Sequence, residues 1–235
     1  MTKQSAFDMK ICGLSNTVDV AAAIDGGASM IGLVFFEKSP RHISLDAAAE
    51  LAKFARETAN GSVQIVALTV NAGDDALSAI CTRFAPDILQ LHGSESPDRV
   101  REIKTLTGTS VMKAIGVSEI ADFDKLLPYG TVADRLLIDA KPPKGSVLPG
   151  GNGLTFDWRI LDALTDELCN GLPVMLSGGL TTANIAEAVH LSHEHPIISG
   201  IDVSSGVETS PGIKDKGLIQ TFLQRAKSAA ASHYP

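Results

Sequence analysis

Short apolar runs and longer amphipathic segments alternate eight times along the chain. The apolar runs are expected to be strands at residues 9–12, 29–35, 63–70, 87–92, 110–117, 135–140, 173–178 and 198–205. The amphipathic segments are expected to be helices at residues 17–25, 44–57, 74–84, 96–106, 118–127, 157–168, 182–191 and 214–228. Strands that alternate with helices predict βαβ units. Because the strands are apolar along nearly their whole length, their parallel sheet should be covered on both faces.

Eight strand–helix units in 235 residues predict an α/β fold, a single (β/α)8 TIM barrel whose one domain spans residues 1–235. An open, doubly wound sheet is the alternative architecture. It is disfavoured because no G-x-G-x-x-G motif follows the first strand. The chain contains no linker or change of composition that would divide it.

Charge and cysteine content narrow the possible functions. The formal net charge is −7 and there is no basic run, so nucleic acids and anionic membranes are poor partners. No apolar run has the length of a membrane span, and the first ten residues lack the apolar segment of a secretory signal. The three cysteines, Cys12, Cys81 and Cys169, form no C-x-x-C pair. Disulfides and a structural zinc site are therefore not expected. The sequence instead favours a location in the reducing cytoplasm.

Polar residues gather where the predicted strands end. Barrel enzymes build their active sites at this C-terminal edge, from strand ends and the loops that follow. The candidates are Cys12, Arg41, His92, Asp139, Gly178, Gly179, Asp202, Ser204, Ser205 and Gly206.

Two loops among these candidates predict a phosphate site. LSGGL (176–180) follows the seventh strand, and the segment DVSSGVE (202–208) contains the end of the eighth. Glycine permits close backbone approach, and exposed N–H groups at a helix start attract an anion. Barrels often bind phosphate with the loops after strands 7 and 8, which makes the pair more informative than either loop alone.

Each remaining candidate also has a structural interpretation. Cys12 is either a packed core thiol or a thiolate in the site. Asp139 ends an apolar strand and is either a general acid, protonated because it is desolvated, or a cap for the next loop. His92 and Arg41 are by default a structural histidine and a surface arginine, although the arginine fork suits a carboxylate. The irregular stretch 141–153 is either a lid or a surface insertion.

Six segments together resemble phosphoribosylanthranilate isomerase, an enzyme family of tryptophan biosynthesis. They are KICGL (10–14), GLVFFEKSPRHIS (32–44), LQLHG (89–93), LLIDA (136–140), LSGGL (176–180) and GIDVSSGVETSPGIKD (200–215). The resemblance covers nearly the whole chain. Its specificity comes from the combination of KICGL, SPR and DVSSGVE.

The resemblance implies a (β/α)8 enzyme without cofactor or metal. Such an enzyme converts N-(5-phosphoribosyl)anthranilate to 1-(2-carboxyphenylamino)-1-deoxyribulose 5-phosphate, an Amadori rearrangement. Carried over motif by motif, Cys12 would be the general base and Asp139 the general acid. Arg41 would hold the anthranilate carboxylate, and the glycines and serines after strands 7 and 8 would hold the phosphate. Because a cysteine base acts as the thiolate, we expect an N–H group or a cation that lowers the thiol's pKa.

Other readings have distinct signatures. The related sugar isomerase of histidine biosynthesis would carry an aspartate on strand 1 and similar halves. Indole-glycerol-phosphate synthase would use a strand-end lysine, and Lys113 lies in strand 5, but KICGL and SPR do not fit. A non-catalytic barrel that binds a phosphorylated ligand would be expected to lack Cys12 or Asp139.

Cys81 and Cys169 are expected to be packing residues. A small phosphorylated substrate is the expected partner, and the sequence leaves monomer and homodimer open.

Overall fold

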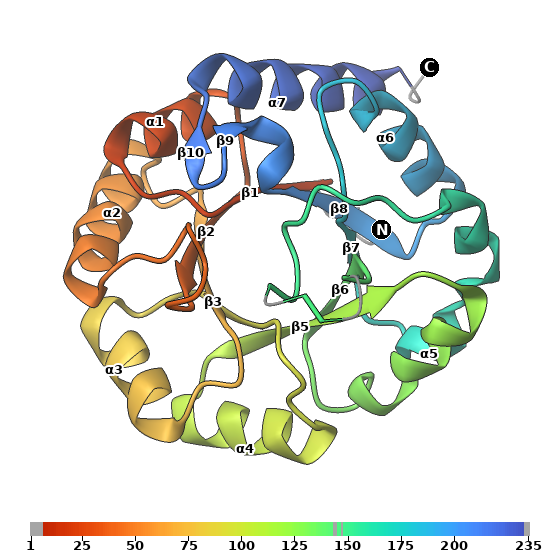
Figure 1. Ribbon diagram of the computed structural model, residues 1–235, viewed down its shortest axis with the longest axis horizontal. Coiled ribbons are helices and arrows are strands. Elements are labelled where there is room, and N and C mark those ends of the chain that lie inside the picture. Colours follow the sequence, from red (N-terminus) through yellow and green to blue (C-terminus); the bar gives the residue numbers. More distant parts are fainter. Residues whose placement is uncertain (1–6, 143–144, 147, 233–235) are drawn as a thin grey trace.

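Eight parallel strands form a closed barrel in the computed structural model, which describes residues 7–142, 145–146 and 148–232 (Figure 1). Neighbouring strands pair in sequence order, and β1 pairs with β8 to close the barrel. The predicted (β/α)8 fold is therefore confirmed. The strands are β1 (Asp8–Cys12), β2 (Met30–Phe35), β3 (Gln64–Thr69), β4 (Ile88–Leu91), β5 (Ser110–Val117), β6 (Arg135–Ala140), β7 (Val174–Leu176) and β8 (Ile198–Val203).

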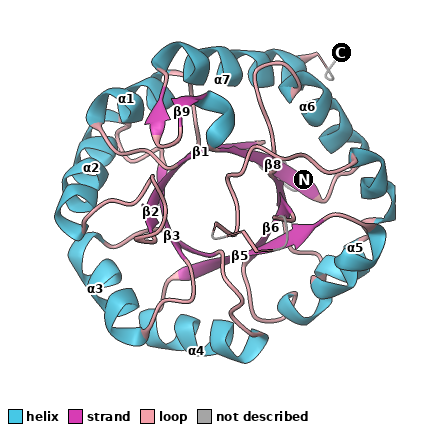
Figure 2. Cartoon of the chain, viewed as in Figure 1, coloured by secondary structure: helices cyan, strands magenta, loops and turns pink. Residues whose placement is uncertain are grey.

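Helices surround the barrel on its outside (Figure 2). They are α1 (Thr17–Asp25), α2 (Leu45–Thr58), α3 (Asp74–Phe84), α4 (Pro97–Thr107), α5 (Asp166–Cys169), α6 (Ile185–Glu194) and α7 (Lys216–Ala231). Local sequence fixes several of their starts. Ser44 and Ser96 accept hydrogen bonds from the N–H groups of Ala47 and Arg99, which satisfies donors that a helix leaves unpaired.

Two predicted helices are wrong. The segment 118–127 forms the 3-10 helices η1 (Ile120–Lys125) and, just beyond, η2 (Leu127–Tyr129). Pro128 has no N–H and disfavours α-helical backbone at the residue before it, which limits this segment to short turns. The segment 157–168 divides into η3 (Trp158–Ala163) and α5, because Leu164 is extended with ψ 116°.

The ends of the strands also differ from the prediction. Strands predicted at 173–178 and 198–205 end at Leu176 and Val203. Beyond β8 lie a 3-10 turn, η4 (Ser205–Val207), and a short hairpin of β9 (Glu208–Ser210) and β10 (Ile213–Lys214) that the hydrophobic pattern did not predict. The polar residues after the strands are therefore in loops, where their side chains and N–H groups are available to a ligand.

Apolar side chains pack the barrel interior on the side away from the C-terminal edge. Strand side chains alone form its buried cluster, namely Met30, Val66, Ile88, Met112, Ala114, Leu137 and Met175. A smaller cluster of Cys12, Val34 and Leu68 lies beside the cavity that these three residues help to line. This packed apolar layer fills the barrel interior beneath the polar groups at the C-terminal edge. Within the described residues, no helix has the length and apolarity needed to cross a membrane.

Candidate active site

A cavity opens at the C-terminal edge of the barrel. All of the predicted site residues except Gly206 line it. One side of the cavity is apolar and includes Val34, Phe36, Leu68 and Val70, while the glycine- and serine-rich loops after β7 and β8 form another. The cavity thus offers different surfaces to an aromatic ring and to an anion.

Cys12 ends β1, and charged side chains lie beside its thiol. Lys10 stands two residues earlier on the same face of the strand and is fully buried. Its Nζ donates a hydrogen bond of 2.8 Å to Oδ1 of Asp202 on β8. A Cβ atom built on Gly32 of β2 would lie 2.8 Å from Sγ of Cys12 and 3.1 Å from Nζ of Lys10. Thiol and ammonium therefore converge above Gly32.

Burial dominates the ionisation of this thiol. Cys12 is 3% exposed, and burial raises the pKa of its thiol above the ordinary value, although the Lys10 ammonium opposes this effect. Burial alone would lower the pKa of Lys10, but Asp202 and Cys12 together raise it. The expected cation beside Cys12 is present. The expected net lowering of the thiol's pKa is wrong, because desolvation outweighs the cation.

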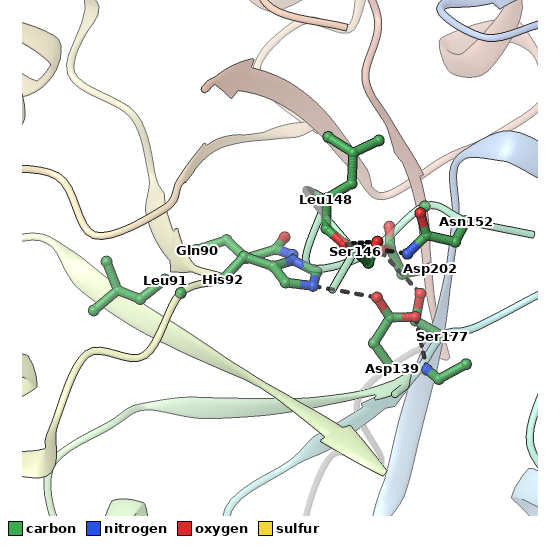
Figure 3. Close-up of polar contacts among 12 residues, drawn as sticks. Gln90, Leu91, His92, Asp139, Ser146, Leu148, Asn152, Ser177 and Asp202 are labelled. Carbon is green, nitrogen blue, oxygen red and sulfur yellow. Dashed lines mark hydrogen bonds and ion pairs between the residues drawn. The ribbon is translucent and has the colours of Figure 1, made fainter. Parts of the chain in front are cut away.

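Asp139 is the next-to-last residue of β6 and lies beside His92, the residue that follows β4 (Figure 3). Asp139 is 4% exposed, and its carboxyl group is held at both oxygens. The backbone N–H of Ala140 donates to Oδ1 at 2.9 Å, and Nε2 of His92 is 3.2 Å from Oδ2. On its other side, Nδ1 of His92 is 3.0 Å from Nε2 of Gln90. The carboxyl group is therefore fixed in orientation, as a proton donor requires.

Arg41 is buried and paired with an acidic residue. Its Nε and Nη2 donate to the two carboxylate oxygens of Glu208 at 2.7 and 2.9 Å. Lys214 donates to the same carboxylate at 2.6 Å and to the backbone oxygen of Ser204 at 2.9 Å. Burial would raise the pKa of Glu208, but Arg41 and Lys214 outweigh it and lower that pKa. Two basic side chains thus share one carboxylate, and burial lowers the pKa of one of them, Lys214, although Glu208 opposes this effect.

Three glycines shape the loops after β7 and β8. Gly178 and Gly179 have φ values of 91° and 61°, a region that favours glycine. A Cβ atom on Gly178 would lie 2.5 Å from the backbone N of Ala140. A Cβ atom on Gly206 would overlap the carbonyl group of Leu180. Gly206 therefore does not line the cavity, but it lets the two loops pack against each other.

The described residues of the segment 141–153, namely 141–142, 145–146 and 148–153, lie over the mouth of the barrel (Figure 1). Residues 143–144 and 147 of this predicted lid lie outside the described residues. The backbone oxygen of Gly151 accepts a hydrogen bond of 3.2 Å from Nη2 of Arg41. A side chain on Gly150 would collide with Asp139 and His92. The described part of the segment thus covers the acidic side of the cavity, and its movement as a lid stays a prediction.

Sequence reasoning missed four residues of the site, Lys10, Gln90, Glu208 and Lys214. Two of them were detectable, because Lys10 and Gln90 each stand two residues before a predicted site residue and therefore share its strand face. Glu208 and Lys214 carried no such signal. Glu208 is 167 residues from Arg41, and the closed barrel brings the two together. Lys214 reaches Glu208 across the hairpin of β9 and β10, which the hydrophobic pattern did not predict. Within the described residues, no cluster of three or more histidine, cysteine or acidic side chains could hold a metal ion.

Comparison with known proteins gives the family. The profile of N-(5'-phosphoribosyl)anthranilate (PRA) isomerase matches residues 9–225. The chain belongs to the phosphoribosylanthranilate isomerase family. A relative from Brucella canis named N-(5'-phosphoribosyl)anthranilate isomerase is 52% identical over 229 residues, which are 97% of this chain and 98% of the relative.

Solved structures of phosphoribosylanthranilate isomerases share the fold. The enzyme from Thermotoga maritima superposes with a TM-score of 0.78 at 31% identity and covers 94% of this chain and 98% of its own. A phosphoribosylanthranilate isomerase in complex with reduced 1-(o-carboxyphenylamino)-1-deoxyribulose 5-phosphate gives 0.75 at 29% identity, with coverage of 94% and 98%. The expected activity, isomerisation of phosphoribosylanthranilate in tryptophan biosynthesis, is confirmed. Neither the histidine-pathway enzyme nor a non-catalytic barrel is favoured.

Proposed function

We propose that the isomerase works by general acid–base catalysis, with Asp139 as the acid and Cys12 as the base. The observation that carries this proposal is their placement. The two side chains come from β6 and β1 and line one cavity. No other strand end contributes a cysteine to that cavity, among the residues described. Acid and base can therefore address one sugar from two sides.

The chemistry follows from these positions. Protonated Asp139 gives its proton to the furanose ring oxygen, and the anthranilate nitrogen opens the ring to an iminium ion. The Cys12 thiolate then removes the proton from C2′, which leaves an enolamine that tautomerises to the ketone. A positioned acid or base contributes about 10²–10⁴-fold to the rate.

The thiolate must form against the cost of burial. Because the pKa of Cys12 is raised, the thiolate is the minor form near neutral pH. The Lys10 ammonium lowers the cost of forming it, and Asp202 keeps that ammonium charged at 2.8 Å. We assign Lys10 the role of supporting the thiolate electrostatically, and Asp202 the role of positioning Lys10.

The phosphate is proposed to bind between the loops after β7 and β8. In the described part of the chain, no acceptor pairs with the backbone N–H groups of Gly178 or Gly179. Ser204 and Ser205 line the same side of the cavity. The Ser204 hydroxyl donates to the backbone oxygen of Cys12 at 3.1 Å, so Ser205 offers the hydroxyl donor here. Free N–H groups in such a glycine loop are suitable donors to phosphate oxygens. The solved structure that contains a 5-phosphate ligand supports a ligand of this class.

The anthranilate carboxylate is proposed to bind at Arg41. The Glu208 carboxylate occupies Nε and Nη2 of the guanidinium, so Nη1 remains for a ligand. The neighbouring Val34, Phe36 and Leu68 provide an apolar surface for the aromatic ring. Grips on a carboxylate and a phosphate at two ends of one substrate would fix its orientation between acid and base.

The proposal also includes the protein's location and its binding partner. All three cysteines are free thiols, which supports a reducing compartment such as the cytoplasm. A small phosphorylated molecule is the proposed partner, and either a monomer or a homodimer is compatible with a cavity formed by one chain.

An activity assay tests the proposed substrate. Purified protein is mixed with freshly prepared phosphoribosylanthranilate, and the loss of substrate fluorescence is followed. Turnover of this substrate, with none for the phosphoribosyl-imidazole substrate of histidine biosynthesis, supports the proposal. Turnover of the imidazole substrate alone would contradict it.

A further inference from the structure

Gln90 is a polar side chain in the barrel interior that the mechanism above does not use. It lies on β4, is fully buried, and faces the same side as His92, two residues later. Its Nε2 is 3.0 Å from Nδ1 of His92, whereas its Oε1 has no hydrogen-bond partner among the described residues. Figure 3 shows Gln90, His92 and Asp139 in a row, with His92 between the residues from β4 and β6.

The hydrogen bonds determine where the histidine carries its proton. If the amide NH₂ of Gln90 donates to Nδ1, that nitrogen must be unprotonated. The single proton of neutral His92 is then on Nε2, which faces Oδ2 of Asp139 at 3.2 Å. An imidazolium is disfavoured in this arrangement, because Nδ1–H and the amide N–H would point at each other.

The reverse orientation of the amide is less favourable. In the reverse orientation, the NH₂ group of Gln90 would occupy the position of Oε1, which has no hydrogen-bond partner among the described residues. Both N–H donors of the amide would then be buried without an acceptor. Buried donors without acceptors are rarer than carbonyl oxygens without donors. The orientation in which Gln90 donates to Nδ1 is therefore the better one.

We propose that Gln90 is a positioning residue that holds His92 neutral, with its proton directed at Asp139, so that His92 does not take the proton needed by the substrate. This inference rests on the proposed role of Asp139 as the acid. A neutral histidine with a proton on Nε2 has no free site facing Asp139, and its other nitrogen is occupied by Gln90. The acid can then transfer its proton only to the ring oxygen of the substrate.

The charges around His92 compete in this balance. Asp139 favours an imidazolium, and the Gln90 amide opposes one. Lys113 and Glu95 form an ion pair of 2.9 Å near His92. Lys113 also donates to the backbone oxygens of Leu91 and Gly93, the residues on either side of His92. This pair is neutral overall and does not decide the charge of His92. The choice between the two states therefore depends on Gln90.

Two substitutions separate the hydrogen bond from the shape of the side chain. Gln90→Glu offers only acceptors to Nδ1 and favours the imidazolium, whereas Gln90→Met keeps a similar volume with no strong hydrogen-bonding group. The protonation of His92 is read from two-bond ¹H–¹⁵N correlation spectra of the whole protein. The signal is assigned by its loss in His92→Asn.

The spectra give a result that does not depend on activity. In the wild type at neutral pH, His92 should be neutral with its proton on Nε2. In Gln90→Glu at the same pH it should be an imidazolium. A proton on Nδ1, or an imidazolium, in the wild type would overturn the proposal even if the enzyme is active.

The pH profile supplies the second readout. An imidazolium beside Asp139 favours its carboxylate, so kcat/KM of Gln90→Glu should fall about 10- to 100-fold as the pH is lowered. Gln90→Met should show a smaller fall, and Gln90→Glu/His92→Asn should lose this pH dependence. Equal, pH-independent losses in both single variants would indicate a merely structural role. Wild-type inactivity with the expected spectra would instead refute the proposed function.

Discussion

The buried Lys10–Asp202 pair predicts an unusual separation of stability from activity. Replacing Lys10 with methionine removes a fully buried ammonium that is 2.8 Å from the Asp202 carboxylate. At this distance and an effective dielectric constant of about 20, the attraction is about 6 kcal/mol, which is comparable to the cost of desolvating the two ions. The intact pair should therefore contribute little net stability.

Removing only one partner has a different effect. Lys10→Met leaves the Asp202 carboxylate buried without its cation, which should lower the free energy of unfolding by about 3–5 kcal/mol. In Lys10→Met/Asp202→Asn no charge remains, so most of that loss should be recovered. Urea unfolding followed by circular dichroism measures both values. The double variant also keeps the test valid if the single variant does not fold.

Activity should not recover with stability. Without Lys10, the Cys12 thiolate loses its neighbouring cation in a buried site, and this loss should reduce kcat by at least about tenfold. The double variant should be stable and still impaired when the loss of substrate fluorescence is followed. Full activity in a stable double variant would refute the role assigned to Lys10. An unchanged stability of Lys10→Met would refute the assignment of the pair as buried and mutually dependent.

Three further outcomes follow from the site and the core. Glu208→Gln removes the carboxylate that orients Arg41, so KM should rise about tenfold or more with a smaller change in kcat; a change in kcat alone would contradict this role. Gly206→Ala should lower the free energy of unfolding by about 1–3 kcal/mol and raise KM, whereas Gly73→Ala, where a Cβ meets open space, should be nearly neutral in both. Burial raises the pKa of Cys169 to about 11. Because the folded state keeps this proton while the unfolded thiol loses it near pH 9, stability should fall between about pH 9 and 11. Cys169→Ala should reduce this fall when urea midpoints are compared across pH, and an unchanged slope would count against the raised pKa.

The fold was predictable because strand and helix patterns are local. Apolar runs of four to eight residues gave all eight barrel strands, with ends displaced by at most two residues. The helix at 118–127 failed because an amphipathic spacing does not register the effect of Pro128, which follows the segment. The hairpin of β9 and β10 failed because its five described strand residues include only one large apolar side chain, Ile213.

The candidate site was predictable where it depends on strand ends. Cys12 is the last residue of β1 and Asp139 the next-to-last of β6, so their place at the barrel mouth follows from the fold. The charge pairs were not predictable, because they join residues such as Lys10 and Asp202, which are 192 positions apart. The raised pKa of Cys12 depends on burial by neighbouring strands, which no local pattern contains.

The central claim is that Cys12 and Asp139 act in proton transfer and not in substrate binding. The most direct measurement compares kcat with the affinity for a reduced, unreactive product analogue in Cys12→Ser and Asp139→Asn, using stopped-flow fluorescence and calorimetry. The account predicts that kcat falls about 10²–10⁴-fold in each variant. The dissociation constant of the analogue should change by less than about tenfold, a difference of about 1.4 kcal/mol. A variant that retains kcat, or one that loses analogue binding in proportion to activity, would contradict the assignment.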